Sequence, residues 1–84
     1  MDNKYVREVF EKQKTCELIK LSYEQPVDGP YKFFTMFTIP MISVKNVKNI
    51  MKTQVKLKHR GDLITLKYSQ IKEIELKPLR HNRI

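Results

Sequence analysis

The segment 53–68 constrains the fold of this chain more than any other part of the sequence. If its two halves pair about Arg60-Gly61 as the central turn residues, apolar residues face apolar residues and polar residues face polar ones. A slip of one residue would destroy this match, because alternate residues of a strand point to opposite faces. Gly61 supplies the positive φ that a tight hairpin turn needs. We therefore predict a β-hairpin with the pairs His59–Asp62, Leu57–Ile64, Val55–Leu66, Lys56–Thr65 and Gln54–Lys67.

Alternating hydrophobicity predicts a strand on the N-terminal side of this hairpin, at 16–24. Ile19, Leu21 and Tyr23 share one face of that strand, as expected for a strand that covers a core on one side. Two prolines and an Asp-Gly step predict a turn at 25–30, because proline removes a ladder donor and glycine accepts positive φ.

The next predicted strand, 31–39, is apolar on both faces. We expect Phe33 and Phe37 in the core, with stacking on single-stranded bases as the alternative. On the opposite face, Phe34 and Met36 need a cover, which is either an N-terminal helix or another protein chain. Both residues are therefore candidates for a protein interface.

An amphipathic helix is predicted at 3–14, with Asp2 or Asn3 as its N-cap. Its apolar stripe consists of Tyr5, Val6, Val9 and Phe10. A helix of this length is marginal alone, so the stripe must dock on the strands or in the groove of a partner.

The remaining elements are short. Pro40 predicts a bend or bulge, followed by a third strand at 42–44 and a turn at 46–52. One turn of 3₁₀ helix after Tyr68 leads into a closing strand, and 77–84 forms a basic tail. One helix and five short strands predict a mainly β (α+β) domain at 1–76, a small five-stranded barrel of the SH3-like or Sm-like kind.

The net charge is distributed unevenly. The chain of 84 residues carries +8, yet residues 1–42 contain six bases and six acids, so the whole excess lies in residues 43–84. Such an asymmetry indicates an anionic partner, which is nucleic acid, an acidic protein or an anionic surface. The alternative is that the charge only keeps a small domain soluble.

The basic residues of the second half are the strongest candidate site. Lys56, Lys58 and Lys67 lie on the polar face of the predicted hairpin, and Arg60 is at its tip. Lys45, Lys48 and Lys52 precede the hairpin. A β-ribbon with clustered lysines can follow a phosphate backbone, and lysine point charges favour non-specific binding over base readout. The alternative is a solvated strand face whose lysines protect an edge from aggregation.

Other site chemistry is absent from the sequence pattern. Cys16 is the only cysteine, the two histidines have no metal-ligand spacing, and the only glycines are Gly29 and Gly61. We therefore expect no metal, no cofactor, no small-molecule substrate and no enzymatic activity. No apolar run is long enough to span a membrane, so we expect a cytoplasmic protein without membrane contact.

Two segments resemble the YolD-like family. They are residues 5–14 with 18–23, a short charged helix before a strand that ends in Tyr, and residues 63–74, with isoleucines at 71 and 74. Proteins of that family come from bacteria, phages and plasmids, and their genes often neighbour error-prone DNA polymerases. The resemblance implies a small barrel and a non-enzymatic accessory role in DNA repair.

Residues 59–64 also resemble the Arg-Gly-Asp/Asn step of the second Sm motif. The uridine pocket of Sm proteins needs an Asp-x-Asn step in the preceding motif as well, and this sequence has none. Two hypotheses of function remain. The first is an accessory or regulatory protein that acts at nucleic acid or on a nucleic-acid enzyme. The second is a protein-interaction module, a homodimer or an adaptor, whose basic face docks an acidic protein.

Overall fold

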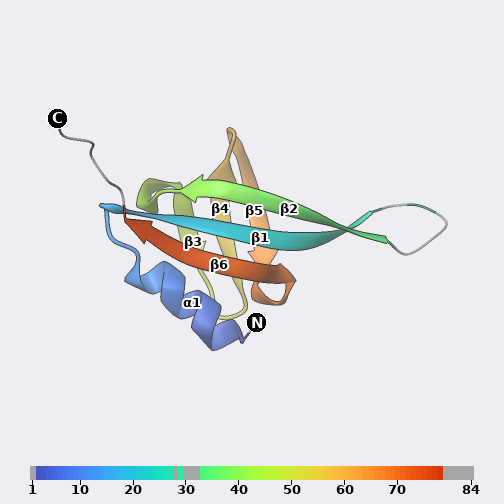
Figure 1. Cartoon of the computed structure of the whole chain (residues 1–84), viewed down its shortest axis with the longest axis horizontal. Coiled ribbons are helices and arrows are strands. Elements are labelled where there is room, and N and C mark those ends of the chain that lie inside the picture. The colour runs from blue at the N-terminus through green and yellow to red at the C-terminus, as the bar shows by residue number, and fades with distance from the viewer. Residues whose placement is uncertain (1, 28, 30–32, 79–84) are drawn as a thin grey trace.

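The computed structural model describes residues 2–27, 29 and 33–78. One helix, two 3₁₀ turns and six strands follow each other along these residues (Figure 1). They are α1 (Asn3–Lys12), β1 (Glu17–Val27), β2 (Phe33–Ile42), η1 (Val44–Asn46), β3 (Val47–Ile50), β4 (Gln54–His59), β5 (Asp62–Lys67), η2 (Tyr68–Gln70) and β6 (Ile71–Pro78). The strands form two antiparallel three-stranded sheets, in the orders β2-β1-β6 and β3-β4-β5.

A mainly β fold with an N-terminal helix is confirmed, but the predicted five-stranded barrel is wrong. The described residues contain six strands in two separate sheets. The additional strand is β3, which lies where a turn was predicted at 46–52. Val47 pairs with Leu57 and Ile50 with Val55, so both apolar side chains join the core and this burial outweighs the turn preference of the asparagines. The two asparagines of this segment have different roles. Asn46 closes η1, because its side-chain oxygen accepts hydrogen bonds from the backbone N–H (3.1 Å) and the hydroxyl (2.7 Å) of Ser43. Asn49 lies within β3, where it pairs with Lys56.

The helix was predicted two residues too long. Asp2 is the N-cap, and its side chain accepts a hydrogen bond from the backbone N–H of Lys4 at 3.1 Å. The helix ends at Lys12 because Gln13 adopts an extended conformation. The side-chain nitrogen of Gln13 donates hydrogen bonds to the backbone carbonyl oxygens of Ile42 at 2.6 Å and Glu17 at 3.2 Å. Gln13 therefore joins the end of the helix to the ends of β1 and β2.

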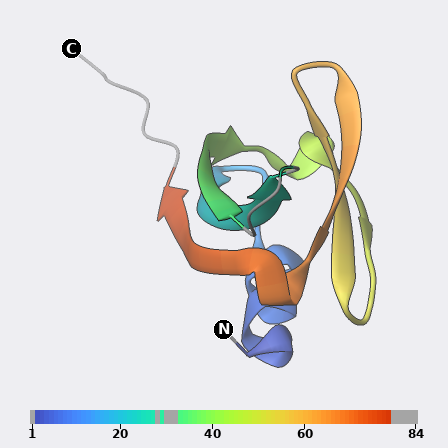
Figure 2. The same ribbon diagram turned by 90° about the vertical axis from the view of Figure 1, so that its right-hand side faces the viewer.

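The helix packs against β6, β3 and η2, across one open end of the two sheets (Figure 2). Val6, Val9 and Phe10 are buried there, whereas Tyr5 is half exposed. Tyr5 therefore does not belong to the docking stripe that the sequence predicted. Val9 and Phe10 follow Val6 by three and four positions, so these three side chains share the helix face that points into the core. Tyr5 lies at the border of that face.

β1 continues through residues that were predicted to form a turn. It extends to Val27, and Pro26 lies opposite Phe34 of β2. The third strand of the sheet, β6, pairs with β1 only as far as Tyr23. Beyond Tyr23, β1 pairs only with β2 among the described strands. Proline, which has no N–H to donate, is tolerated on a strand that has a free edge.

β2 also runs further than predicted. It begins at Phe33, continues through Pro40 to Ile42, and the predicted residues 31 and 32 lie outside the described residues. The register shifts between the pairs Leu21–Ile39 and Ile19–Ile42, so the extra residue opposite β1 forms the bulge that Pro40 predicted. The separate third strand at 42–44 is wrong, because Ile42 ends β2 and Val44 begins η1.

The hairpin of β4 and β5 has the predicted register at every predicted pair. Arg60 and Gly61 form its turn with φ values of 52° and 83°, the combination that matches the right-handed twist of the flanking strands. A 3₁₀ turn before the closing strand is also confirmed, but it lies at Tyr68–Gln70 and so begins at Tyr68 instead of after it, which leaves Ile71, Ile74 and Leu76 in β6. The closing strand β6 extends to Pro78, and residues 79–84 of the predicted tail lie outside the described residues.

The core lies between the two sheets and under the helix. It contains Ile19, Leu21, Ile39 and Ile42 from β1 and β2, Val55, Leu57 and Leu66 from the hairpin, Tyr68, Ile71 and Ile74 from the closing segment, and Val6, Val9 and Phe10 from α1. The fully buried Tyr68 donates its phenolic hydrogen to the carbonyl oxygen of Met51 at 2.6 Å. This bond joins the closing segment to the β3–β4 turn.

Burial raises the pKa of Tyr68 above its usual value of 10.0, while Arg7 opposes this shift and Glu11 adds to it. The folded state therefore binds the phenolic proton more tightly than the unfolded state. The resulting stability is complete below pH 10 and is lost as the pH rises through the folded-state pKa. We expect a Tyr68→Phe variant to lack this loss, because it has no phenol to ionise.

The measurement is urea unfolding of the protein and of Tyr68→Phe from neutral pH to above pH 10. At neutral pH we expect the variant to be less stable by about 1–2 kcal/mol, because the carbonyl of Met51 loses its donor. Above pH 10 this difference should shrink by up to about 1.4 kcal/mol per pH unit. A difference between the protein and Tyr68→Phe that stays constant over this pH range would contradict the prediction.

Candidate nucleic-acid interface

The face of the β3-β4-β5 sheet that points away from the core carries the central lysines. Val55 and Leu57 of β4 are buried, so Lys56 and Lys58 point to the opposite side. On β5 the buried residue is Leu66, and Lys67 follows it on the outer side. We call this surface the basic face; Lys58 and Lys67 are exposed on it and Lys56 is half-buried.

The strand register shows how the lysines of the basic face lie relative to one another. Lys56 and Lys58 are two residues apart on β4, about 7 Å along the strand. Lys56 pairs with Thr65 of β5. Lys67 pairs with Gln54, which precedes Lys56 by two residues on β4 and so lies on the same side of the sheet. Three of the seven predicted basic residues are therefore brought together on one sheet surface.

The other four predicted residues lie around the ends of the same sheet. Lys45 and Lys48 lie in η1 and at the start of β3, which pairs with the end of β4, so they share an end of the sheet with Arg60 at the hairpin tip. Lys52 is in the β3–β4 turn, at the opposite end. All four are exposed, and the ammonium of Lys48 donates to the carbonyl oxygen of Lys45 at 3.1 Å.

Among the described residues, no carboxylate forms an ion pair with the lysines of the basic face. In residues 44–67, all of which the structure describes, Asp62 is the only acid. Asp62 pairs with His59 on the side of Leu57, away from the three central lysines. Among the described residues the ion pairs are Arg7–Glu11 at 3.6 Å, Lys72–Glu24 at 3.8 Å and Lys77–Glu75 at 3.6 Å, and none of them involves the seven predicted bases.

Sequence reasoning missed several neighbours of these lysines. Asn49 lies opposite Lys56 on β3, and it was missed because its segment was interpreted as a turn. Gln54 and Thr65 were already paired with lysines in the predicted hairpin, so the same register identifies them as polar members of the basic face. The exposed Leu63, which lies opposite Lys58, is the apolar member of the basic face.

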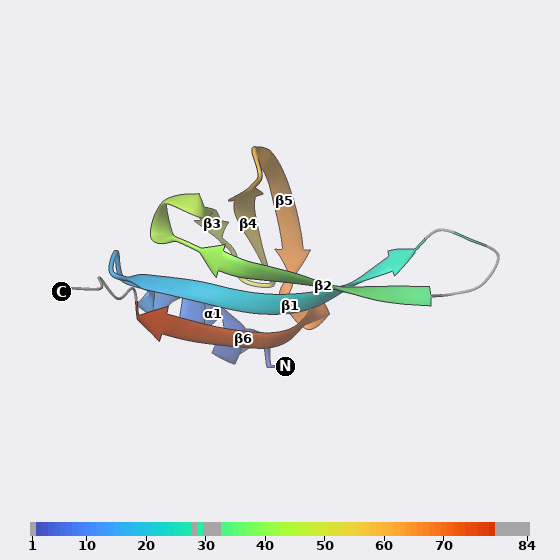
Figure 3. The same ribbon diagram turned by 45° about the horizontal axis from the view of Figure 1, so that its top comes forward.

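The two predicted interface residues, Phe34 and Met36, lie far along the other sheet. They are on the part of β1 and β2 that extends past the end of β6, residues 24–27 and 33–36, which we call the arm (Figure 3). Phe34 is 66% and Met36 51% exposed, so the helix does not cover them. Their candidacy as an interface remains a prediction.

Phe33 and Phe37 do not lie in the core, which corrects the prediction. They are 58% and 42% exposed: Phe33 lies on the arm, and Phe37 lines an open hollow of about 300 Å³ beside His59, Arg60 and Asp62 at the tip of the β4–β5 hairpin. The ring of Phe37 stacks on that of Tyr23, with centroids 5.6 Å apart. The aromatic residues of β2 are therefore largely exposed, and Phe37 shares a hollow with Arg60 at the hairpin tip.

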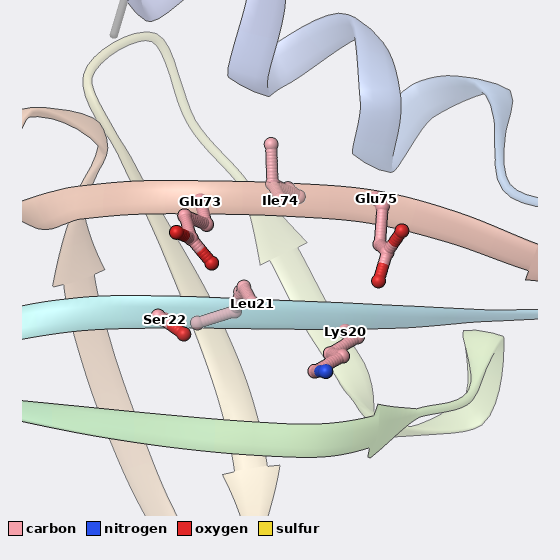
Figure 4. Close-up of a pocket in the computed structure, with 6 residues that line it drawn as sticks. All are labelled: Lys20, Leu21, Ser22, Glu73, Ile74 and Glu75. Carbon is pink, nitrogen blue, oxygen red and sulfur yellow. The ribbon is translucent and has the colours of Figure 1, made fainter.

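The outer side of the β2-β1-β6 sheet has a different electrostatic character. A shallow hollow of about 190 Å³ lies there between β1 and β6, lined by Lys20, Ser22, Glu73 and Glu75 over Leu21 and Ile74 (Figure 4). Its two glutamates and one lysine give it mixed charge, which disfavours phosphate. The two outer surfaces of the protein therefore differ, and only the basic face combines several lysines with no acid.

Within the described residues no three His, Cys, Asp or Glu side chains come together as metal ligands. The one helix described is too short to cross a membrane. Comparison of the chain with protein-family models, with curated proteins and with solved structures found no match.

Proposed function

We propose that this protein is a non-enzymatic accessory or regulatory protein that binds the phosphate backbone of nucleic acid through the basic face. The observation that carries the proposal is the cluster of Lys56, Lys58 and Lys67 on one sheet surface, where none of them has an ion-pair partner among the described residues. Phosphates would neutralise these charges and release counterions, which is the main source of non-specific affinity. Asn49, Gln54 and Thr65 add hydrogen-bonding groups that suit phosphate and sugar oxygens.

Binding of this kind follows charge rather than sequence. Lysines contact phosphates as mobile point charges, without the fixed fork with which arginine reads guanine. Arg60 is the only arginine of the seven, and it sits at the hairpin tip. We therefore expect similar affinity for different base sequences. The resemblance to YolD-like proteins supports an accessory role beside a DNA polymerase, and the proposal does not depend on it.

The test is fluorescence anisotropy of labelled single-stranded DNA, duplex DNA and RNA, titrated with the protein. Titrations at about 50 and 200 mM salt give the salt dependence, and three lysine–phosphate contacts predict a log–log slope of about −3 or steeper. The absence of binding at the lower salt concentration would overturn the proposal. Binding of poly-glutamate in place of all three nucleic acids would favour an acidic protein as the partner.

A second candidate function, protein interaction, is favoured by a separate observation. The arm exposes Phe33, Phe34 and Met36 to solvent, and exposed apolar clusters are typical of interaction sites. The two functions use different sheets of the molecule and are compatible. Variants of the arm and of the basic face separate them.

A further inference from the structure

β2 is an edge strand whose first part, residues 33–39, lacks the usual protection against pairing, since Pro40 and its bulge protect only the end of the strand. It is the outermost strand of its sheet among the described residues, and its ten residues, FFTMFTIPMI, include no charged side chain. The other edges do carry charge: Lys48 on β3, Asp62 and Lys67 on β5, and four charged residues on β6. Natural proteins place charges on exposed edges to block association. Residues 33–39, which precede the Pro40 bulge, therefore present an uncharged edge that is open to pairing.

Both faces of β2 expose apolar side chains in its first half. Phe34 and Met36 point outward and are 66% and 51% exposed. Phe37, on the inner side, is 42% exposed at an open hollow between β2 and the tip of the β4–β5 hairpin. A partner strand beside β2 would shield these side chains from water on both faces at once, which a partner on one face alone cannot do.

The sequence of this half is symmetric about Thr35. In an antiparallel pair of identical strands centred on Thr35, Phe33 lies opposite Phe37 of the second copy, and Phe34 lies opposite Met36 of the second copy. The two Thr35 residues then lie opposite each other on the axis. Aromatic pairs and threonine pairs are among the favourable cross-strand combinations. We propose that β2 pairs with β2 of a second copy, in this register, to form a homodimer with a continuous six-stranded sheet.

The register follows from the symmetry and the side chains. In such a dimer the two-fold axis must place one residue opposite the same residue of the second copy. Only then do the inner faces of both copies lie on the same side of the shared sheet. Moving the axis from Thr35 to Met36 would place Phe34 opposite Thr38 and Phe37 opposite Thr35, which replaces apolar pairs with mixed ones. The Thr35 register is the better of the two.

The shape and charge of the molecule are compatible with this pairing. Thr35 lies on the arm, which extends past the end of β6 (Figures 1 and 3), and the two paired strands run in opposite directions. The two bodies therefore lie toward opposite ends of the shared ribbon. Each copy carries +8, and the uncharged β2 is the edge at which two such copies approach with least repulsion.

The position of Thr35 on the axis allows a specific test. Thr35→Lys places two positive charges opposite each other, and Thr35→Glu places two negative ones, so each variant alone should dissociate. Like charges in direct opposition should raise the dimer dissociation constant at least about 100-fold. An equimolar mixture pairs Lys with Glu and should restore a dimer with a dissociation constant within about tenfold of the original.

The measurement is sedimentation equilibrium without nucleic acid, at about 0.3 M salt to screen net repulsion, over about 1–300 µM protein. Thr15→Lys and Thr15→Glu introduce the same charges at an exposed turn outside β2 and should leave the dimer intact. Circular dichroism checks that every variant is folded. A monomeric wild-type protein over this range would overturn the proposal, as would dimeric Thr35 variants or a mixture that stays monomeric. None of these outcomes bears on phosphate binding by the basic face.

Discussion

Exchange of Lys56 and Lys67 for glutamate is expected to weaken binding to duplex DNA at least about 100-fold at moderate salt. Both lysines lie on the basic face, where neither has an ion-pair partner among the described residues. The exchange removes two cations and adds two anions to a surface without other acids. We also expect the log–log salt slope to become shallower by about 2, because two counterion-releasing contacts are lost.

The matched control is the double variant Lys4→Glu/Lys14→Glu. Lys4 lies in the first turn of α1 and Lys14 lies two residues past its end, and both are exposed. The exchange changes the net charge by the same four units. If affinity depends on the basic face, this control should retain most of the binding. Equal loss in both double variants would show that net charge alone attracts the nucleic acid, and the assignment of the basic face would be wrong.

Truncation of Phe10 to alanine is expected to lower the free energy of unfolding by about 3–5 kcal/mol. Phe10 is 3% exposed and belongs to the core that α1 shares with both sheets. Removal of its ring leaves a cavity at the junction of helix and sheets. A domain of this size has a total stability of about 5–15 kcal/mol, so the variant loses a large fraction of it.

Urea unfolding measures this effect, and Tyr5→Ala on the same helix is its control. Tyr5 is 50% exposed, and surface substitutions of this kind change stability by about 0.5 kcal/mol or less. The sequence pattern placed both aromatic residues in one stripe, so the comparison also tests which of them docks. A loss for Tyr5→Ala as large as that for Phe10→Ala would contradict the packing described for α1.

The hairpin shows how much local pattern can determine. Its strands adjoin in the chain, and a single register matches Val55 with Leu66 and Leu57 with Ile64. Because the alternation has period two, that register also determined which lysines share the basic face. Asp2 as the N-cap, the 3₁₀ turn at Tyr68 and the bulge near Pro40 were predictable in the same way, since each depends on residues within a few positions.

Contacts between distant segments were not determined by local pattern. Val47 and Ile50 become strand residues because β4 lies beside them, and the asparagines around them predicted a turn. Phe33 and Phe37 have a core-like pattern, yet they are exposed, because Phe33 lies on the arm and the space between Phe37 and the hairpin tip stays an open hollow. No residue near β2 in the sequence specifies where the other sheet ends.

The sequence by itself determined the elements whose stabilising contacts are local: the helix, the hairpin register and the side of the hairpin on which Lys56, Lys58 and Lys67 lie. The tertiary structure decided how many sheets form, which apolar residues are buried and which edge is left open. The physical reason is that burial depends on the surfaces of segments far apart in the chain. β2 illustrates this difference, because its apolar pattern alone is consistent with a core strand, whereas its place at the edge of the sheet exposes it as a pairing surface.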